Sequence, residues 1–441
     1  MPNTHKHKAI AALSFPIIGG MISQNIVNLV DTAMVGQVGT SALASVGLGS
    51  FLNFFCSALV MGLAVGVQTQ TARLRGAGKE QYAIPLNGGL SLSTIISLPL
   101  CFLLIWQTPN LMALVTESPA IAEEGSLYLQ ARLTGMIALG ANFAFRSYWS
   151  AIEKAHFYLF TLIIMHSCNI LINWVLIFGH WGMPAMGVEG AGYGTALSMW
   201  IGLLIHISLA FRHAIPFGFL KGLPDKKAWK ELLTMSLPSG IERMFFALGM
   251  TIFMTLIGWI GDAELAASNI ILNLFLVAIL PAMGFGIASA TFVAKAIGAQ
   301  KYEELSMWKT AVSQWALGTL MCIGLCFYLF NNEIISLFTE ELLPGQLASS
   351  TLYLMILFLP CEAFHMVTYQ SLMGLADNRF VMFLTLSLQW LVVLPLIYLI
   401  AVSWSWGLVW AWGIHFAGRV MQLICYTLRW RYKLKTQAYS V

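Results

Sequence analysis

Charged residues are scarce in this chain. Only 10% of its 441 residues are Asp, Glu, Lys or Arg, whereas 58% are hydrophobic. A soluble globular domain carries about 25% charged residues. The scarcity excludes an ordinary soluble protein and indicates a polytopic membrane protein built from long apolar helices.

Cysteine is also rare, and the motifs of common enzymes are missing. The seven cysteines lie in apolar runs, and Cys322 and Cys326 have no second pair or histidine beside them, so we expect small buried residues and no metal site. The chain contains no His-Glu-x-x-His, no Gly-x-Ser-x-Gly and no Walker-type phosphate loop. We therefore expect neither an enzyme nor a primary pump.

Long apolar runs are what the chain has instead. The first is too long for a signal peptide and no cleavage site follows it, so we interpret it as a transmembrane helix. Several runs exceed the roughly 20 residues that cross a bilayer and are expected to tilt or kink. The prediction is an all-α membrane protein with twelve transmembrane helices, at about residues 8–37, 41–72, 82–107, 119–152, 156–179, 187–211, 231–260, 264–296, 309–330, 347–376, 379–403 and 405–428.

Lysine and arginine set the predicted orientation. Those in loops and tails all fall on one side of the twelve helices, and the opposite loops carry acids. By the positive-inside rule, both termini are cytoplasmic. The basic residues of this side are Lys6, Lys8, Arg73, Arg75, Lys79, Lys154, Arg212, Lys221, Lys226, Lys227, Lys230, Lys295, Lys301, Lys309, Arg379, Arg429, Arg431, Lys433 and Lys435.

The chain repeats itself, with a constant shift of 222 in the numbering. In that register "VGQVGTSALAS" (35–45) lies over "IGWIGDAELAA" (257–267), and "RLRGAGK" (73–79) lies over "KAIGAQK" (295–301). At a shift of 223, "KAHF" (154–157) falls over "DNRF" (377–380). Because each half has an even number of helices, the two are parallel repeats, an architecture that suits alternating access. A scaffold or a channel is the alternative that repetition alone leaves open.

These repeats define the predicted domains. Residues 1–212 form an N-lobe with helices 1–6, residues 213–230 form a cytoplasmic linker, and residues 231–441 form a C-lobe with helices 7–12.

A carboxylate, Asp31, stands inside the first span. Gln24, Asn28 and Asp31 follow one another at i, i+4 and i+7 and share one helical face, while Asn169 and Asn173 lie one turn apart on the fifth span. An amide can donate to a carboxylate or accept from a carboxylic acid, so this setting tolerates both protonation states. We predict a functional proton site, the alternative being a static contact between helices. Thr195 on the sixth span is a further oxygen for the same network.

Two other features of the spans bear on function. Pro16 stands within the first span, where it removes a backbone hydrogen bond and predicts a kink or a point of flexing. The second half has Phe253 where the repeat register places Asp31. Its own polar residues include Glu362 and His365, one turn apart on the tenth span, which form a candidate cation site or proton shuttle. The sequence also offers soft, apolar lining candidates, among them Phe143, Phe145, Phe245, Phe246, Met250 and Met254.

The chain resembles the MATE (multidrug and toxic compound extrusion) transporters. The resemblance lies in Pro16, in "NLVDTAMVGQVGTSALAS" (28–45), in "RGAGK" (75–79) and in the two six-helix halves, and it covers essentially the whole chain. "SFPIIGG" (14–20), together with Asn169, resembles the bacterial DinF-type branch. That branch usually has Asn and then Asp on the fifth helix, whereas this chain has Asn173 in the second place.

The resemblance implies a secondary antiporter of the bacterial inner membrane that exports drugs and other organic cations. It implies that Asp31 is the protonation site, that Pro16 is the bend of the first helix and that Asn169 is a partner of Asp31. Asn173 removes one acid and so favours H⁺ over Na⁺ as the coupling ion. We expect a monomer surrounded by membrane lipids, with no cofactor and no nucleic-acid partner. The alternatives are a Na⁺-coupled antiporter using Glu362 and a lipid-precursor flippase of the same superfamily.

Overall fold

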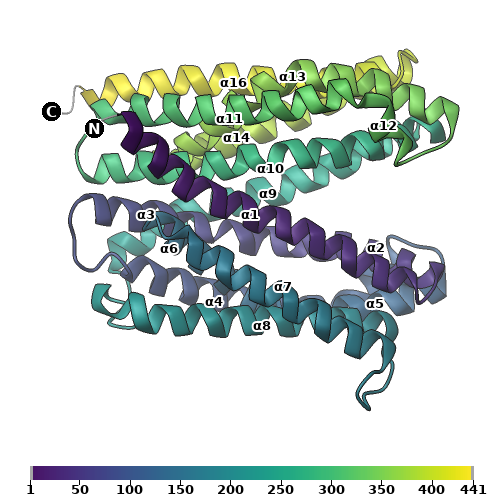
Figure 1. Ribbon diagram of the computed structural model, residues 1–441, viewed down its shortest axis with the longest axis horizontal. Helices are drawn as coiled ribbons and strands as arrows, with labels where there is room; N and C mark the ends of the chain where they lie inside the picture. Colours follow the sequence, from purple (N-terminus) through teal and green to yellow (C-terminus); the bar gives the residue numbers. More distant parts are fainter. Residues whose placement is uncertain (1–2, 439–441) are drawn as a thin grey trace. The chain divides into compact units, whose positions relative to one another are not determined.

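The computed structural model describes residues 3–438, and within that range all regular secondary structure is helical (Figure 1). Residues 1–2 and 439–441, the outer ends of the predicted lobes, lie outside the described residues. The first half contains α1 (Asn3–Gly36), α2 (Thr40–Gly62), α3 (Ala64–Gly76), α4 (Ile84–Ala113), α5 (Pro119–Leu133), α6 (Met136–Ala151), α7 (Ala155–Phe178), α8 (Gly187–His213) and the 3₁₀ turn η1 (Ile215–Phe217). The second half contains α9 (Lys226–Gly258), α10 (Asp262–Gly298), α11 (Glu303–Leu329), α12 (Asn331–Ser336), α13 (Leu342–Gly374), α14 (Asn378–Leu388), the π-helical η2 (Gln389–Val393), α15 (Leu394–Leu396), the π-helical η3 (Ile397–Ser403) and α16 (Leu408–Ala438).

The predicted twelve-span architecture is confirmed, but three predicted spans are not continuous α-helices: 41–72 is divided into α2 and α3, 119–152 is divided into α5 and α6, and 379–403 contains η2 and η3. Eleven helices in the described range are long and apolar enough to cross a membrane. The predicted fourth span, residues 119–152, is divided into α5 and α6, of 15 and 16 residues. Gly135 stands at the break, where a Cβ would lie 2.9 Å from Cα of Ala196 on α8. The glycine therefore lets α8 approach closely, and α5 and α6 together make the twelfth span.

The helix boundaries repeat at the shift found in the sequence. Helix α1 ends at Gly36, and α9 ends at Gly258, the position that the shift of 222 assigns to it. Helix α2 begins at Thr40, and α10 begins at Asp262, which the same shift relates to Thr40. The shared "VGQVG" and "IGWIG" segments are therefore the connection between the first two spans of each half. Gly39 has a φ of 153° in this connection, a conformation that glycine adopts at no steric cost.

The turn after the second span has the same conformation and the same hydrogen bonds in both halves. Gly78 and Gln300, which the same shift relates, have φ of +67° and +57°. In both turns the preceding N–H bonds the carbonyl four residues back, at 2.9 and 3.0 Å. The following N–H bonds the carbonyl five residues back, at 3.0 and 2.9 Å. This is a Schellman-type helix end, which favours glycine at the position with positive φ. The second half forms it with Gln300 in that position.

A third pair of turns has the same form at a shift of 223. Glu153 and Ala376 have φ of 60° and 62°, and the N–H groups around them bond carbonyls four and five residues back. The extra residue agrees with the slip that the sequence shows between "KAHF" and "DNRF". The two halves are therefore copies of one backbone plan, and the predicted repeat is confirmed.

The helices gather into two compact units. The N-unit comprises Phe15–Met244, and the C-unit comprises the residues up to Ser14 together with those from Phe245 onward. Both boundaries fall inside helices, α1 and α9, whereas the predicted lobes meet at the linker 213–230. The lobes describe the sequence repeat and the units describe packing, so the predicted lobe boundaries stay a prediction.

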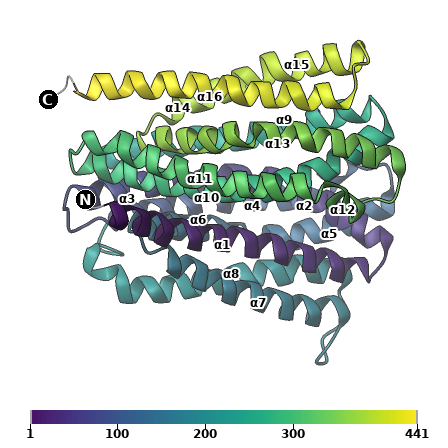
Figure 2. The same cartoon turned by 45° about the horizontal axis from the view of Figure 1, so that its top comes forward.

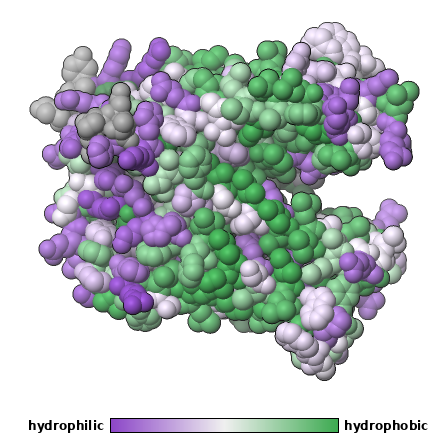
Figure 3. Space-filling model, viewed as in Figure 1, coloured by the Kyte–Doolittle hydropathy of each residue, from purple (hydrophilic) through white to green (hydrophobic). Residues whose placement is uncertain are grey.

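Within each unit the helices pack through apolar side chains. In the C-unit, α10, α11 and α13 contact one another and lie side by side (Figure 2). On the visible face, hydrophobic side chains cover the middle of the helices and hydrophilic ones gather nearer their ends (Figure 3). This distribution is the one a membrane-spanning helix needs.

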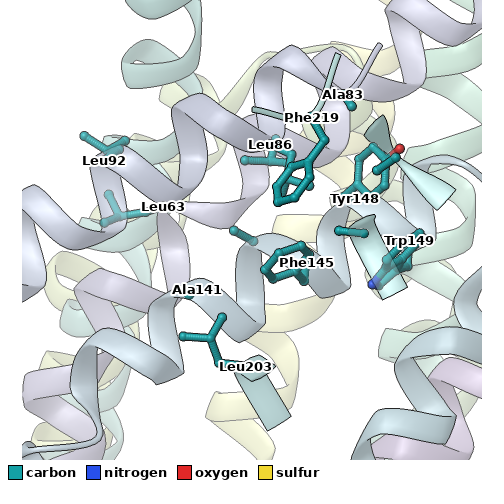
Figure 4. Close-up of a cluster of buried hydrophobic side chains, with 14 of the residues drawn as sticks. Leu63, Ala83, Leu86, Leu92, Ala141, Phe145, Tyr148, Trp149, Leu203 and Phe219 are labelled. Carbon is teal, nitrogen blue, oxygen red and sulfur yellow. The ribbon is translucent and has the colours of Figure 1, made fainter. Parts of the chain in front are cut away.

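The N-unit has a large buried core around α6 (Figure 4). Phe145, Tyr148 and Trp149 are fully buried there, and Phe145 stacks on His206 of α8 with ring centroids 5.3 Å apart. The Nε1–H of Trp149 donates to Nδ1 of His206 at 3.1 Å. Phe145 was expected as part of a soft substrate lining, and that expectation is wrong because the ring is sealed in this core.

Candidate functional site

A chain of side-chain hydrogen bonds starts at Asp31. Nδ2 of Asn173 donates to Oδ1 of Asp31 at 2.8 Å and lies 3.5 Å from Oδ1 of Asn169. Nδ2 of Asn169 donates to the hydroxyl of Thr195 at 3.3 Å. The chain joins α1, α7 and α8 within the N-unit. The structure therefore links four of the predicted site residues, Asp31, Asn169, Asn173 and Thr195.

The amides of this chain are buried, whereas Asp31 is half-buried. Asn173 is 0% exposed and Asn169 is 3% exposed. Oδ1 of Asn173 has no hydrogen-bond partner among the described residues. A buried amide oxygen without a partner is costly, so this atom is ready to accept a hydrogen bond.

Glycine on α8 explains why that oxygen is left without a partner. Gly194 lies directly opposite Asn173, and a Cβ on Gly194 would collide with Oδ1 of Asn173. Gly190 and Gly192 make similar close approaches, to the backbone of α7 and α5. The "GAGYG" segment of α8 thus lets three helices converge at the level of the amides while offering no side chain to them.

Gln24 and Asn28 occupy the same helix as Asp31 but bond to each other. Nε2 of Gln24 donates to Oδ1 of Asn28 at 3.2 Å, and the side chain of Asn28 is exposed. The predicted stripe on α1 is therefore present, but its hydrogen bonds form two groups, one around Asn28 and one around Asp31.

An arginine that the sequence left without a role lies near the carboxylate. Arg132, at the C-terminal end of α5, is within electrostatic range of Asp31. Its backbone N lies 3.3 Å from the place where a Cβ on Gly192 would be. Arg132 therefore stands at the level of the α8 glycines and brings a positive charge near the carboxylate. An arginine so far from Asp31 in the chain gives no local signal of this in the sequence.

Pro16 lies inside α1, on the N-terminal side of Asp31. At 1.5 Å per residue the two are about 22 Å apart along the helix. Just beyond the proline, α1 touches α7: a Cβ on Gly20 would lie 2.7 Å from the ring of Tyr158, and one on Gly19 would lie 3.5 Å from Leu159. The turn of α1 that lacks a backbone hydrogen bond at Pro16 therefore lies next to a close contact between α1 and α7.

The matching place in the C-unit is apolar and aromatic. Phe253 is 1% exposed and packs edge-on against Trp412 at 5.0 Å and an interplanar angle of 86°. The ring of His415 lies 5.2 Å from that of Phe253 and 5.7 Å from that of Trp412. Nε1–H of Trp412 donates to the hydroxyl of Ser268 at 2.9 Å, so the indole is satisfied. The carboxylate and amides of the N-unit site therefore correspond here to a cluster of buried rings.

Glu362 and His365 lie elsewhere in the C-unit and are already engaged. Arg419 on α16 holds both oxygens of Glu362, with Nε at 3.1 Å and Nη2 at 2.5 Å. Nδ1 of His365 is 3.5 Å from the same carboxylate and its Nε2 is 3.0 Å from Oε1 of Gln422. The guanidinium stands where a cation bound to Glu362 would have to be, which disfavours the candidate cation site.

Metal-ligand clusters are not part of either site. Between residues 3 and 438, no group of three or more His, Cys, Asp or Glu side chains is close enough to hold a metal ion. The atoms around Asp31 are amide and hydroxyl groups, which suit hydrogen bonding to a carboxylate in either protonation state.

The structure therefore defines a multi-pass membrane protein of two homologous six-helix halves, with a carboxylate–amide network in the first half and a buried arginine–glutamate–histidine network in the second. The MatE family model matches both halves, over residues 16–175 and 238–399, and the starts of the two matches are related by the repeat shift. The chain belongs to the MatE family. The predictions of a MATE transporter, and of a protein that is not an enzyme, are confirmed.

Curated relatives agree with this assignment. The chain is 29% identical over 416 residues to the probable multidrug resistance protein NorM of Mesorhizobium japonicum, covering 89% of this chain and 87% of that protein. It is 28% identical over 406 residues to the protein of the same name from Xanthomonas axonopodis pv. citri, covering 90% and 87%. These relatives carry the name NorM, so the predicted DinF-type branch stays a prediction.

The fold also matches solved structures. A crystal structure of a MATE protein in complex with MaL6 superposes with a TM-score of 0.90, covering 98% of this chain and 97% of that one, at 22% identity. At that identity the likeness concerns the fold, and the role of the polar network has to be argued from this chain's own residues.

Proposed function

We propose that this protein is a proton-coupled exporter of drugs and other organic cations. The names of its relatives as multidrug resistance proteins support the substrate class. The observation that carries the coupling is the Asn173 amide, whose nitrogen donates to Asp31 while its buried oxygen has no partner in the described structure.

That amide can serve Asp31 in both protonation states. The ionised carboxylate accepts from the Asn173 nitrogen, as it does at 2.8 Å. A protonated Asp31 becomes a donor, and the Asn173 oxygen can then accept its proton. The exchange reverses one hydrogen bond and gives the buried Asn173 oxygen a partner that it lacks while Asp31 is ionised. Protonation thus changes which atoms of α1 and α7 are paired, and this is the local event that a coupled transporter needs.

Helix α1 transmits this event in the proposed cycle. A proton from the periplasmic side binds Asp31, its contacts with α7 change, and α1 bends at Pro16, where one backbone hydrogen bond is missing. The bend displaces the substrate outward. The tight contact of Gly20 with Tyr158 gives the bend a neighbour against which to move.

The same proposal includes the setting of the protein. The chain lies in the bacterial inner membrane with both termini in the cytoplasm, as the one-sided distribution of lysine and arginine supports. It acts as a monomer among lipids, needs no cofactor and uses H⁺ as its coupling ion. Na⁺ coupling through Glu362 is the weaker alternative, because Arg419 already neutralises that carboxylate.

The test is efflux from proteoliposomes that carry the purified protein. Ethidium transport under an imposed pH step is measured for the wild type and for Asp31→Asn. Asp262→Asn, on the exposed start of α10, is the matched carboxylate-to-amide control. We expect Asp31→Asn to lose at least about 90% of pH-driven transport, since an amide cannot take up the proton, while Asp262→Asn keeps the wild-type rate.

Two results would contradict the proposal. Wild-type pH-driven transport by Asp31→Asn would show that the proton binds elsewhere. Transport that follows a Na⁺ step at fixed pH, and disappears in Glu362→Gln, would assign the coupling to Na⁺ and the C-unit.

A further inference from the structure

The first turns of α1 contact α11 within the C-unit (Figure 1). The Nε1–H of Trp315 on α11 donates to Nδ1 of His7 on α1 at 2.9 Å, and the two ring centroids lie 6.0 Å apart. A neutral imidazole that accepts at Nδ1 carries its hydrogen on Nε2. The contact therefore joins the two helices and makes Nε2 of His7 a donor.

A groove of about 540 Å³ opens beside this contact. Its polar walls are already bonded: the Trp315 N–H by His7, and the Thr319 hydroxyl by the Trp315 carbonyl at 3.0 Å. Nothing lies within 4 Å of a Cβ placed on Gly318, so the groove is open there. The groove therefore presents mainly apolar surface. Its lining residues are His7, Gln314, Trp315, Gly318, Thr319 and Cys322.

The position of the groove indicates what fills it. Gln314, Gly318 and Cys322 are exposed on α11, which is one of the helices apolar enough to cross a membrane. The part of such a helix that the protein leaves uncovered faces lipid acyl chains. From Gln314 to Cys322 the lining follows α11 for about 12 Å, at 1.5 Å per residue. A hydrogen-bonded tryptophan at one end of it is typical of the level of the lipid head groups.

Basic side chains stand at the end of the groove that the proposed orientation places in the cytoplasm. Lys6 and Lys8 flank His7 on α1, with Lys8 exposed and Lys6 half-buried. Among the described residues, no carboxylate forms an ion pair with either lysine. Glu304, at the start of α11, already pairs with Lys301 at 3.5 Å. The two ammonium groups therefore favour a negatively charged partner at this end of the groove.

We propose that this groove binds one anionic phospholipid of the cytoplasmic leaflet. One acyl chain lies along α11 between Gln314 and Cys322. The phosphate accepts from Lys6, Lys8 and the Nε2–H of His7. A zwitterionic lipid carries its own ammonium group beside the phosphate and so gains less from the two lysines. Basic residues between transmembrane helices on the cytoplasmic side are a setting that suits anionic head groups.

The lipid site lies on the part of α1 that precedes its proline. Residues up to Ser14 belong to the C-unit, residues from Phe15 onward belong to the N-unit, and Pro16 follows directly. A lipid that touches both His7 and α11 holds the first turns of α1 in place, so the bend of the proposed cycle starts from a fixed end. This consequence rests on the proposed function, whereas lipid binding itself does not depend on proton coupling.

The experiment locates the lipid by photo-crosslinking in nanodiscs of phosphatidylcholine, without any gradient. The probe is a phosphatidylglycerol with a diazirine in one acyl chain, and mass spectrometry of peptides maps its adducts. We expect adducts on residues 314–322. The same probe with a phosphocholine head group should label this segment roughly 10-fold less or weaker still, since each lysine near the head group contributes a factor of about five.

Glycine variants test the groove. Gly318→Leu introduces a side chain that occupies the open part of the groove, so labelling of the α11 segment should fall to the level of neighbouring lipid-facing peptides. Gly318→Ala, which adds only a methyl group, should have a smaller effect. Gly47→Leu on α2 is the matched control, because nothing lies within 4 Å of a Cβ there either, and it should keep the wild-type labelling.

Lysine variants test the head group. The double variant Lys6→Gln with Lys8→Gln should reduce labelling by the phosphatidylglycerol probe to the level of the phosphocholine probe. The control is Lys226→Gln with Lys227→Gln, which removes two exposed lysines from the start of α9 and should leave the labelling of α11 unchanged.

The outcomes separate the lipid site from its effect on α1. Equal labelling by the two head groups, or labelling that Gly318→Leu leaves undiminished, would overturn the site. Ethidium transport under a pH step should be faster with phosphatidylglycerol in the vesicles than without it, and Gly318→Leu should remove this difference. The same response in both proteins would overturn the role in α1. A protein without proton coupling would still give the crosslinks, so failure of the proposed function is recognised separately.

Discussion

Asp31 in the N-unit and Phe253 in the C-unit hold the same place in the two repeats and have opposite surroundings. Asp31 accepts a hydrogen bond from the buried Asn173 amide, which continues to Asn169 and Thr195, and lies within electrostatic range of Arg132. Phe253 meets an indole and an imidazole ring in a buried cluster. The backbone plan is shared and the chemistry is not.

The two halves agree most closely in the turns between their helices. The helix ends at Gly78 and Gln300, and those at Glu153 and Ala376, have the same conformation and the same hydrogen bonds. These are positions where backbone geometry alone matters. Inside the spans, side chains are free to differ as long as each region is internally satisfied. In the proposed function the N-terminal half couples transport to the ion, while the matching place in the other half is packed with aromatic rings.

The largest effect is expected from placing the acid of one half into the other. Phe253→Asp would remove a buried ring and bury a carboxylate among aromatic side chains, so the free energy of unfolding should fall by at least about 4 kcal/mol. Thermal denaturation of the purified protein measures this, with Phe253→Leu, at about 1–2 kcal/mol, as the control. A Phe253→Asp protein as stable as the wild type would show that packing does not require an apolar residue at position 253.

The next largest effect concerns the ion pair of the C-unit. Glu362→Gln leaves Arg419 buried without its counter-charge, and we expect a loss of about 3 kcal/mol. The double variant Glu362→Gln with Arg419→Gln should recover most of that loss. If the single variant is stable but loses Na⁺ stimulation of transport, the role of Glu362 is coupling and not structure.

A smaller effect is expected from a methyl group in the N-unit. Gly194→Ala places a Cβ against Oδ1 of Asn173 and should displace the amide from Asp31. Transport driven by a pH step should fall roughly 10-fold, because misplaced groups lose the hydrogen bond. Gly47→Ala on α2 is the control, since nothing lies within 4 Å of a Cβ there. Equal transport rates for Gly194→Ala and Gly47→Ala would show that the position of the Asn173 amide does not matter for proton coupling.

Much of the fold follows from the sequence because it depends on local and repeated features. Apolar length gives the spans, and the constant repeat shift gives the two halves. The break between α5 and α6 does not follow, because Thr134 and Gly135 lie inside an apolar run and only the approach of α8 explains the glycine. The π-helical segments η2 and η3 have no sequence signature either, since they arise from how that span packs.

The site divides in the same way. The spacing of Asn169 and Asn173 predicts both amides on one face, and in the structure they lie 3.5 Å apart, nitrogen to oxygen. The pairing of Arg419 with Glu362 joins residues on different helices that are distant in the chain, and Arg132 of α5 lies within electrostatic range of Asp31 of α1. Such contacts depend on tertiary packing, which periodicity within one helix does not report.

The amide at position 173 has a consequence for the energetics of export. With Asp31 as the single acid of the network, each turnover in the proposed cycle moves one proton. Exchange of one proton for a singly charged cation transfers no net charge, so the pH difference alone limits accumulation, to about tenfold per unit. A neutral zwitterion leaving through the same cycle would make it electrogenic, and the membrane voltage would add about 2.3 kcal/mol per 100 mV. The stoichiometry set by one side chain therefore decides which drugs the membrane voltage helps to expel.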